Sequence, residues 1–391
     1  MNVYVVGSFE DKTTFGESTI IEPKAKTGFF IAKYNSEGEF LWVKQGGNYY
    51  SAYPGSCKAY AVKPDAEGNI VMTASVVGMY DDWKDDPSLP MEKRYLGKAY
   101  YEDEEITGDD FYIGGHTIVL KLTSDGDLLW KRFCGIGMGF MDLAIGHEGN
   151  FYLSGNFGGI TNFEGKEIKA NGLQDILVLK LDPQGNTIWL KQFGSGKTWD
   201  PAAGATDIEF ASCVDVDKAG NVYIAGRFCY DARFDDITVE SDAIQKGGLD
   251  LGNVFLASLT PDGSTKWVRT VSSKLSSSIT GMDADSEGNS YLYGMFSFKK
   301  GTFNGISCRG PFVAKTDKNG NTEWIEDGKT RELSLFKTEK TVLSYPGGIA
   351  LNGAEDRIYT TGNATQTIVE SGIYTTTTSE TIIAVTQIKL K

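Results

Sequence analysis

The stretch from Met79 to Gly115 combines aromatic and acidic side chains in a pattern that suits ligand binding. Its aromatic candidates are Tyr80, Trp83, Tyr95, Tyr100 and Tyr101. Aromatic rings stack on sugar faces, and carboxylates accept hydrogen bonds from hydroxyl groups, so the stretch is a candidate site for a glycan or a protein contact. The alternative without a ligand is a loop that folds over the edge of its own sheet and leaves a solvated acidic rim.

Two shorter segments add to this candidate binding surface. Tyr49 and Tyr50 lie in one of them, and Trp199 with Asp200 lies in the other. Because all these segments join the same ends of the expected strands, we assign them to one ligand-binding face.

Catalytic chemistry has weaker support. Two carboxylates at a suitable separation can hydrolyse a glycosidic bond, but the sequence does not show which of its many acids lie close together. A Ser/His/Asp site is disfavoured, since the chain has two histidines, His116 and His147, and no Gly-x-Ser-x-Gly turn. We therefore name no catalytic residue and favour binding over catalysis.

Two Asp-x-Asp pairs resemble the start of a calcium loop. Asp215 precedes Asp217 and Asp283 precedes Asp285, but the twelfth positions hold Gly226 and Gly294, which have no side-chain oxygen. Hairpin geometry explains these turns without a metal, so we expect no cofactor and keep calcium as a minor alternative. The five cysteines form no Cys-x-x-Cys pair, which disfavours zinc and a disulfide framework.

Composition excludes several classes of partner. The formal net charge of −14 argues against nucleic acid and against anionic membrane surfaces. No run of about 18 apolar residues is present, so we expect no transmembrane segment. The N-terminal residues do not form a signal peptide.

The elements that must position these residues come from an internal repeat. A glycine is followed four residues later by tryptophan at Gly38–Trp42, Gly126–Trp130, Gly185–Trp189, Gly263–Trp267 and Gly320–Trp324. Five of the seven tryptophans share this context, which chance does not readily produce.

Two further elements repeat with the tryptophan. One is Gly-Asn-x-Tyr with a second glycine five residues after the asparagine, as at Asn150 with Gly155 and at Asn221 with Gly226. The other is an apolar strand, whose six copies are Phe29–Lys33, Thr117–Leu122, Ile176–Leu181, Val254–Leu259, Phe312–Lys315 and Ile382–Ile388. One unit is therefore four strands, a to d, in which tight glycine turns join a to b and c to d, and longer connections join b to c and d to a.

Six antiparallel four-stranded units predict an all-β chain that forms one six-bladed β-propeller. The expected single domain covers residues 1–391, with units at about 1–46, 58–134, 140–194, 211–271, 280–327 and 347–391. We expect Trp42, Trp130, Trp189, Trp267 and Trp324 to pack between blades rather than to bind sugar.

The first and last units are incomplete in complementary ways. The first begins at strand b, and the last ends after strand c. We expect the chain to be truncated at its N-terminus, and the missing piece to carry an export signal or a membrane anchor.

The assembled unit resembles the bacterial β-propeller repeats known as SBBP repeats. The resemblance rests on Asp-x-x-Gly-Asn-x-Tyr-x-x-Gly, on Phe-x-Gly at Phe163–Gly165 and Phe303–Gly305, and on Gly-x-x-x-Trp. It implies an exported, surface-attached protein, in some cases a lipoprotein, and supplies no catalytic residues. We expect a non-catalytic propeller that binds a glycan or a protein through its long-loop face. The alternatives are a propeller enzyme acting on polysaccharide, as hydrolase or lyase, and a structural module of a larger surface assembly.

Overall fold

The protein is an all-β chain, as predicted. The computed structural model describes residues 2–49, 57–78, 99–106, 114–195, 208–241, 252–272, 277–303, 306–327, 339–368 and 381–389. Within those residues the chain forms strands and turns, and no helix long and apolar enough to cross a membrane is found there. The chain divides into two compact units: unit 1, residues 1–170 with 177–190, and unit 2, residues 171–176 with 191–391.

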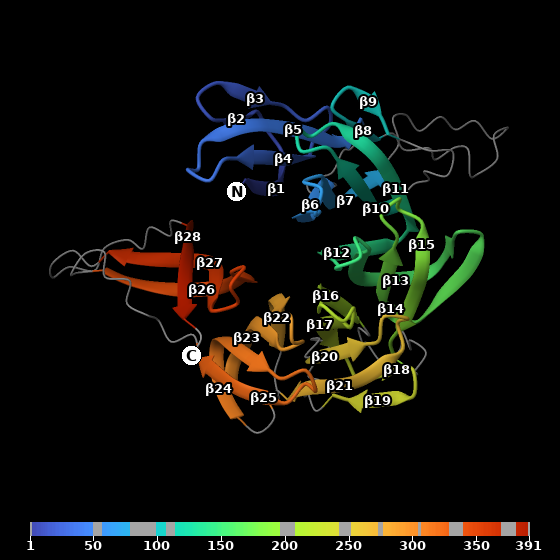
Figure 1. Ribbon diagram of the computed structural model, residues 1–391, viewed down its shortest axis with the longest axis vertical. Helices are drawn as coiled ribbons and strands as arrows, with labels where there is room; N and C mark the ends of the chain where they lie inside the picture. Colours follow the sequence, from blue (N-terminus) through green and yellow to red (C-terminus); the bar gives the residue numbers. More distant parts are fainter. Residues whose placement is uncertain are drawn as a thin grey trace. The chain divides into compact units, whose positions relative to one another are not determined.

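Unit 1 contains three antiparallel sheets (Figure 1). Short stretches of two strands of the third sheet, β14 and β15, belong to unit 2. The first is formed by β1 (Val3–Phe9), β4 (Gly28–Tyr34), β5 (Phe40–Asn48), β8 (Ala99–Tyr101) and β9 (Glu104–Glu105), with a small hairpin of β2 (Thr13–Phe15) and β3 (Thr19–Ile21) beside it in sequence. The second is formed by β6 (Cys57–Pro64), β7 (Ile70–Gly78), β10 (Gly114–Leu122) and β11 (Leu128–Ile136). The third is formed by β12 (Met138–Ile145), β13 (Phe151–Phe163), β14 (Lys166–Leu181) and β15 (Thr187–Phe193).

Unit 2 continues the same pattern (Figure 1). Its first sheet is formed by β16 (Phe210–Val216), β17 (Val222–Phe228), β20 (Asn253–Leu259) and β21 (Thr265–Ser272), with a separate hairpin of β18 (Asp231–Phe234) and β19 (Ile237–Glu240). The next is formed by β22 (Ser277–Ala284), β23 (Ser290–Phe303), β24 (Ile306–Thr316) and β25 (Thr322–Asp327), and pairing of β21 with β23 joins the two. The last is formed by β26 (Glu339–Leu351), β27 (Arg357–Ile368) and β28 (Thr381–Lys389).

The strand order follows the predicted unit. Each complete sheet pairs its strands in the order a, b, c, d, and all six predicted copies of strand c are observed, as β4, β10, β14, β20, β24 and β28. In the described part of the chain, the first sheet begins with strand b (β1) and the last ends with strand c (β28).

Hydrogen bonds explain why the a–b turn reads Asp-x-x-Gly-Asn. In one such turn, Gly220 has a φ of 81°, a left-handed conformation that favours glycine. Asp217 Oδ1 accepts the backbone N–H groups of Ala219 and Asn221, at 2.9 and 2.8 Å. The Asn221 side-chain amide donates to Asp217 Oδ2 at 2.7 Å, so the aspartate and the asparagine fix the turn together.

The glycine of strand b makes room for a β-bulge. Strand a is irregular where it passes this glycine, for example between Ala211 and Cys213. A Cβ atom on Gly226 would lie 2.0 Å from the Phe210 carbonyl oxygen, and one on Gly155 would lie 1.7 Å from the Gly139 oxygen. Only glycine fits such an approach by backbone atoms, which explains its regular spacing from the turn.

A row of tyrosine, lysine and tryptophan crosses strands b, c and d. In the first sheet Tyr4 pairs with Lys33, and Lys33 pairs with Trp42. Lys33 is only 7% exposed, and its Nζ lies 5.8 Å from the centre of each ring. The same row recurs as Tyr291, Lys315 and Trp324. Ring faces thus stabilise a buried ammonium group.

Each of three tryptophans also packs on the c–d turn of the following sheet. A Cβ atom on Gly126 would lie 3.0 Å from the ring of Trp42, and one on Gly185 would lie 3.2 Å from Trp130. Trp267 lies against Gly320 and donates its Nε1–H to the Lys318 carbonyl at 3.0 Å. Trp267 is 8% exposed, whereas Trp42, Trp130, Trp189 and Trp324 are half-buried. Trp42, Trp130 and Trp267 are therefore anchors between neighbouring sheets within each unit.

Candidate functional site

Where the structure describes them, several b–c connections contain β-hairpins rather than open loops. In the predicted loop Met79–Gly115, the described residues 99–106 form the hairpin β8–β9. β8 pairs with β5, strand d of the preceding sheet, with Tyr101 opposite Gly46. The same relation holds in unit 2, where β23 extends beyond its own sheet and pairs with β21. The described residues 99–106 therefore cover an edge of the preceding sheet, whereas the ligand-free alternative placed the segment over its own sheet.

Two predicted ligand-binding tyrosines are buried by this pairing. Tyr100 is 0% exposed and Tyr101 is 3% exposed. Tyr101 donates its hydroxyl to the Gly126 carbonyl at 2.8 Å, and burial raises its pKa. Burial likewise raises the pKa of Tyr100 to about 12. Both rings pack inside the protein instead of facing solvent on a loop, because β8 lies in a sheet.

Tyr49 and Tyr100 nevertheless lie together in the structure. Their ring centres are 5.3 Å apart. Lys24 reaches over both rings, with Nζ 5.1 Å from the centre of Tyr49 and 4.3 Å from that of Tyr100. It also donates to the Glu102 carbonyl at 2.8 Å, and its backbone N–H donates to the Tyr100 hydroxyl at 3.0 Å. The remaining predicted binding residues, Tyr50, Tyr80, Trp83, Tyr95, Trp199 and Asp200, lie outside the described residues.

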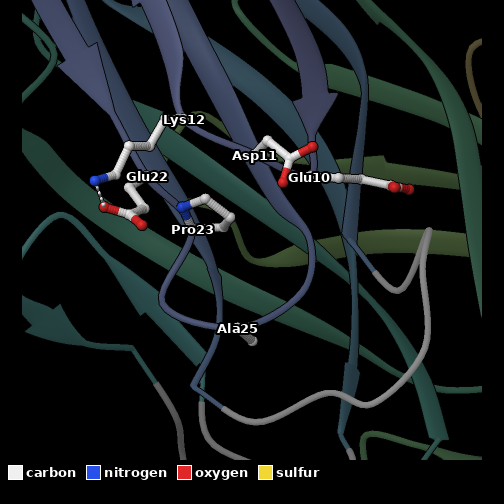
Figure 2. A pocket seen from close by; sticks show the side chains of 6 residues that line it. All are labelled: Glu10, Asp11, Lys12, Glu22, Pro23 and Ala25. Carbon is white, nitrogen blue, oxygen red and sulfur yellow. Dashed lines mark ion pairs between the residues drawn. The ribbon is translucent and has the colours of Figure 1, made fainter.

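A hollow of about 420 Å³ lies in the b–c connection of the first sheet. Two of the residues that line it, Pro23 and Ala25, flank Lys24 in the sequence. It is lined by Glu10, Asp11, Lys12, Glu22, Pro23 and Ala25. Lys12 Nζ lies 3.3 Å from Glu22 Oε2, and both side chains are more than half exposed. Figure 2 shows this ion pair on one side of the hollow and the carboxylates of Asp11 and Glu10 on the other. The hollow thus offers several acceptors and one cationic donor to a polar ligand.

A second cluster of carboxylates lies in unit 2, where the connections enter strand c and strand a. Asp175 and Glu209 are both fully buried. A Cβ atom on Gly194 would lie 2.6 Å from Glu209 Oε2 and 2.9 Å from Asp175 Oδ1, so the two carboxyl groups lie close together. The pair was not predicted, since residues 175 and 209 are far apart in sequence and neither belongs to a recognisable motif.

Hydrogen bonds show what these two acids hold. Gln192 Nε2 donates to Asp175 Oδ2 at 2.6 Å, and the backbone N–H of Gly172 donates to Oδ1 at 3.3 Å. The backbone N–H of Ser195 donates to Glu209 Oε2 at 2.7 Å. Burial raises the pKa of Asp175, and these hydrogen bonds oppose the rise in part. The pair therefore ties strands c and d to the start of the following strand a.

The Asp-x-Asp pairs have two different structural roles. Asp217 and Asp285 cap their own turns. Asp215 Oδ2 accepts the N–H of Ala284 at 2.6 Å, and Asp283 Oδ2 accepts the N–H of Leu351 at 2.7 Å. Each first aspartate thus binds strand a of the next sheet. Calcium at these turns stays an untested minor alternative; among the described residues, no group of three side chains that could hold a metal ion is found.

Four of the described cysteines lie inside the protein. Cys57, Cys134, Cys213 and Cys229 are buried. Burial raises the pKa of Cys134 to about 11, which keeps its thiol protonated at neutral pH.

Comparison with known proteins adds little. No family model matches the chain. No curated protein matches it either. Among solved structures, a protein of unknown function from Bacteroides caccae is similar at 11% identity and a TM-score of 0.43, over 87% of this chain and 86% of the other. Kuenenia stuttgartiensis hydrazine synthase is similar at 10% identity and a TM-score of 0.38, over 88% of this chain and 92% of the other. Both similarities are too distant to support an inference about this protein.

Proposed function

We propose that this chain is a non-catalytic six-bladed β-propeller that binds a glycan or a protein partner through its long-loop face. The observation that carries the binding proposal is the hollow beside the Tyr49–Tyr100–Lys24 cluster. It combines exposed carboxylates with one lysine, and Lys24, which packs on Tyr100, lies between two of the lining residues in the sequence. That combination suits hydroxyl-rich or polar ligands, because carboxylates accept hydrogen bonds and the lysine donates them.

The six-bladed arrangement is supported by the repeat itself. The six copies of strand c and the repeated contact of a tryptophan with the next sheet's turn are what a radial stack of sheets needs. An exported or surface-attached location is part of the proposal and rests on the resemblance to SBBP repeats. Immunodetection in cell fractions of the source organism tests it, and a purely cytoplasmic signal would oppose it.

The test of binding is a glycan-array screen followed by titration calorimetry on each hit. In the double variant Asp11→Asn with Glu22→Gln, we expect affinity for the hit to fall at least about tenfold, since two acceptors in the hollow are weakened. Glu37→Gln, an exposed carboxylate in a c–d turn, is the matched control and should bind as the parent does. Unchanged affinity in the double variant would place binding elsewhere.

A second candidate, polysaccharide cleavage, is favoured by one observation: two buried carboxyl groups close together, with the pKa of Asp175 raised. Against it, both groups are fully buried and hold backbone N–H groups. Turnover assays on the array hits with Asp175→Asn and Glu209→Gln distinguish the two. Product formation by the parent that both variants abolish would establish an enzyme. The structural-module alternative predicts no hit in the screen.

A further inference from the structure

Asn171 and Gly172 form a pair in which a side-chain amide can react with the backbone of its own chain. The Gly172 nitrogen can attack Cγ of Asn171, because the product is a five-membered succinimide ring and glycine has no Cβ atom to obstruct its closure. The pair lies in β14, shortly before the buried part of that strand, and Asn171 is exposed. The attacking nitrogen must lose a proton and the departing amide nitrogen must gain one. A group that contacts both nitrogens would therefore accelerate the reaction.

The carboxyl group of Asp175 contacts both of them. The Gly172 N–H donates to Asp175 Oδ1 at 3.3 Å, and the Asn171 side-chain amide donates to Oδ2 at 3.1 Å. The backbone N–H of Asn171 donates to the same carboxyl group, at 3.2 Å to Oδ1 and 3.1 Å to Oδ2. Asp175 thus binds the attacking nitrogen and the departing nitrogen of one Asn-Gly pair.

The surroundings of Asp175 suit it to proton transfer. Asp175 is fully buried, and burial raises its pKa, so its carboxyl group takes up a proton more readily than an exposed carboxylate does. Gln192 Nε2 donates to Oδ2 at 2.6 Å and fixes the orientation of the group. The exposure of Asn171 gives water access to the reaction product.

We propose that Asn171 is a self-modification site, at which Asp175 acts as the general base and then the general acid of deamidation. The Asp175 carboxylate takes the proton of the Gly172 N–H while the Gly172 nitrogen bonds to Cγ of Asn171. The proton then passes from Asp175 to the Asn171 side-chain nitrogen, the bond from that nitrogen to Cγ breaks, and ammonia leaves. Water adds to one of the two succinimide carbonyls and opens the ring, which leaves aspartate or isoaspartate at position 171.

Two other Asn-Gly pairs in the described residues, Asn319-Gly320 and Asn352-Gly353, are internal controls. The Gly320 N–H donates to the Asp317 backbone carbonyl at 2.8 Å, and that oxygen is a far weaker base than a carboxylate. Asn352 Oδ1 accepts two backbone N–H groups of its own turn, at 3.0 and 2.9 Å, which holds its side chain in place. We expect folding to slow the reaction at these two pairs and to accelerate it at Asn171.

The first test compares native and unfolded parent chain. Peptide mapping by mass spectrometry separates asparagine from aspartate and isoaspartate at all three positions in one sample. In guanidinium chloride the three pairs should react at similar rates. In the native protein at the same pH and temperature, we expect the rate at Asn171 to exceed its unfolded rate at least about tenfold, and the rates at Asn319 and Asn352 to fall below theirs.

The variant Asp175→Asn separates catalysis from restraint. We expect it to lower the native rate at Asn171 at least about tenfold, because the base is gone. A carboxyl group that only restrained the segment would give the opposite result, since a looser Asn171 reaches the cyclic geometry more easily. If the variant does not fold, the comparison of native with unfolded parent decides alone. A native rate at Asn171 no higher than the unfolded rate, or an unchanged or faster rate in folded Asp175→Asn, would overturn the proposal. No ligand is needed, so the result is independent of the proposed function.

Discussion

Within each unit, neighbouring sheets are joined by side-chain contacts. A tryptophan contact occurs in both units, and an aspartate contact is observed in unit 2. In both units a tryptophan packs on the glycine of the next c–d turn, as Trp130 does on Gly185 and Trp267 on Gly320. In unit 2, Asp215 and Asp283 also bind the N–H of the next strand a. The tryptophan contact is part of the repeat, whereas the aspartate contact is a local addition.

Unit 1 has no aspartate at the equivalent positions of its two a strands, and one of these strands, β6, also lacks the N–H group. Lys63 pairs with Val71 as Asp215 pairs with Tyr223, so a lysine stands where the carboxylate would be. Pro64 occupies the place of Ala284 and has no N–H to donate. In unit 1 strand a of the third sheet is instead held by the Thr117 hydroxyl of β10, which donates to the Met138 carbonyl at 2.9 Å and accepts the N–H of Phe140 at 3.0 Å. Sheets with the same strands thus differ in which side chain binds the next strand a.

The largest expected effect is one that the two units share. Gly155→Ala in unit 1 and Gly226→Ala in unit 2 each force a Cβ atom to within 1.7 and 2.0 Å of a backbone oxygen. We expect each to lower the free energy of unfolding by about 5 kcal/mol or to prevent folding. Gly353→Ala, where nothing lies within 4 Å, is the control. Urea denaturation measures all three, and a mild effect at only one bulge would show that the units differ there.

The next effect compares the shared contact between units. Trp130→Ala and Trp267→Ala should cost about 3–5 kcal/mol, with the larger loss at Trp267 because it is more buried and its N–H is hydrogen-bonded. Trp267→Phe, which keeps a ring but loses the donor, should recover most of the loss. Equal losses for Trp130→Ala and Trp267→Ala would mean that the hydrogen bond to Lys318 contributes nothing.

A smaller effect is specific to unit 2. Asp215→Ala leaves the N–H of Ala284 without its acceptor, and we expect a cost of about 1–3 kcal/mol. Lys63→Ala at the equivalent position in unit 1 is the matched control and should be nearly neutral. Chemical denaturation gives both values, and amide exchange at Ala284 should rise in the unit 2 variant alone. A costly Lys63→Ala would break the proposed difference between the units.

Much of this fold could be predicted from the sequence, because the same turn and strand pattern occurs in several copies along the chain. Glycine spacing gives the turns, and the constant offset between Gly185 and Trp189 gives the c–d hairpin. The single-copy features could not be predicted. Nothing in the sequence shows that Glu102 accepts the N–H of Gln45 across 57 positions, or that Asp175 and Glu209 meet beside Gly194.

The binding residues show the same limit. Aromatic residues among acids were a sound signal of a special segment, but burial of Tyr100 and Tyr101 depends on β8 pairing with the preceding sheet. That pairing is between distant parts of the chain and has no local pattern. Lys24, which holds Tyr49 and Tyr100 together, was missed because a single lysine in a polar connection carries no signal.

The carboxyl groups of the turns and of the buried pair should respond to pH in opposite directions. Burial raises the pKa of Asp175, so the native state binds its proton more tightly than the unfolded state does. Its contribution to stability therefore grows as the pH falls from neutral toward the ordinary carboxyl range. Hydrogen bonds from Asn186 lower the pKa of Asp182, so its contribution is lost on acidification.

The variant Asp175→Asn separates these contributions. We expect the stabilisation on mild acidification, measured as the urea midpoint between pH 7 and pH 5, to be smaller in the variant than in the parent. Asp182→Asn should change the profile in the opposite sense, mainly at lower pH. An unchanged profile in Asp175→Asn would mean that this carboxyl group is not held with a raised pKa.

The smallest expected effect concerns the residue before each tryptophan, where the units differ in polarity. Leu41, Leu129 and Ile188 are 47, 50 and 48% exposed, whereas unit 2 has Lys266 and Glu323 at this position. Because a charged residue is accommodated there in unit 2, Leu129→Lys should change the free energy of unfolding by less than about 0.5 kcal/mol. Leu128→Lys is the control, since Leu128 packs against the core and should be costly to replace. Urea denaturation measures both variants. If Leu129→Lys lowered the free energy of unfolding as much as Leu128→Lys does, the exposed apolar residue before the tryptophan would stabilise unit 1, although unit 2 has a charged residue there.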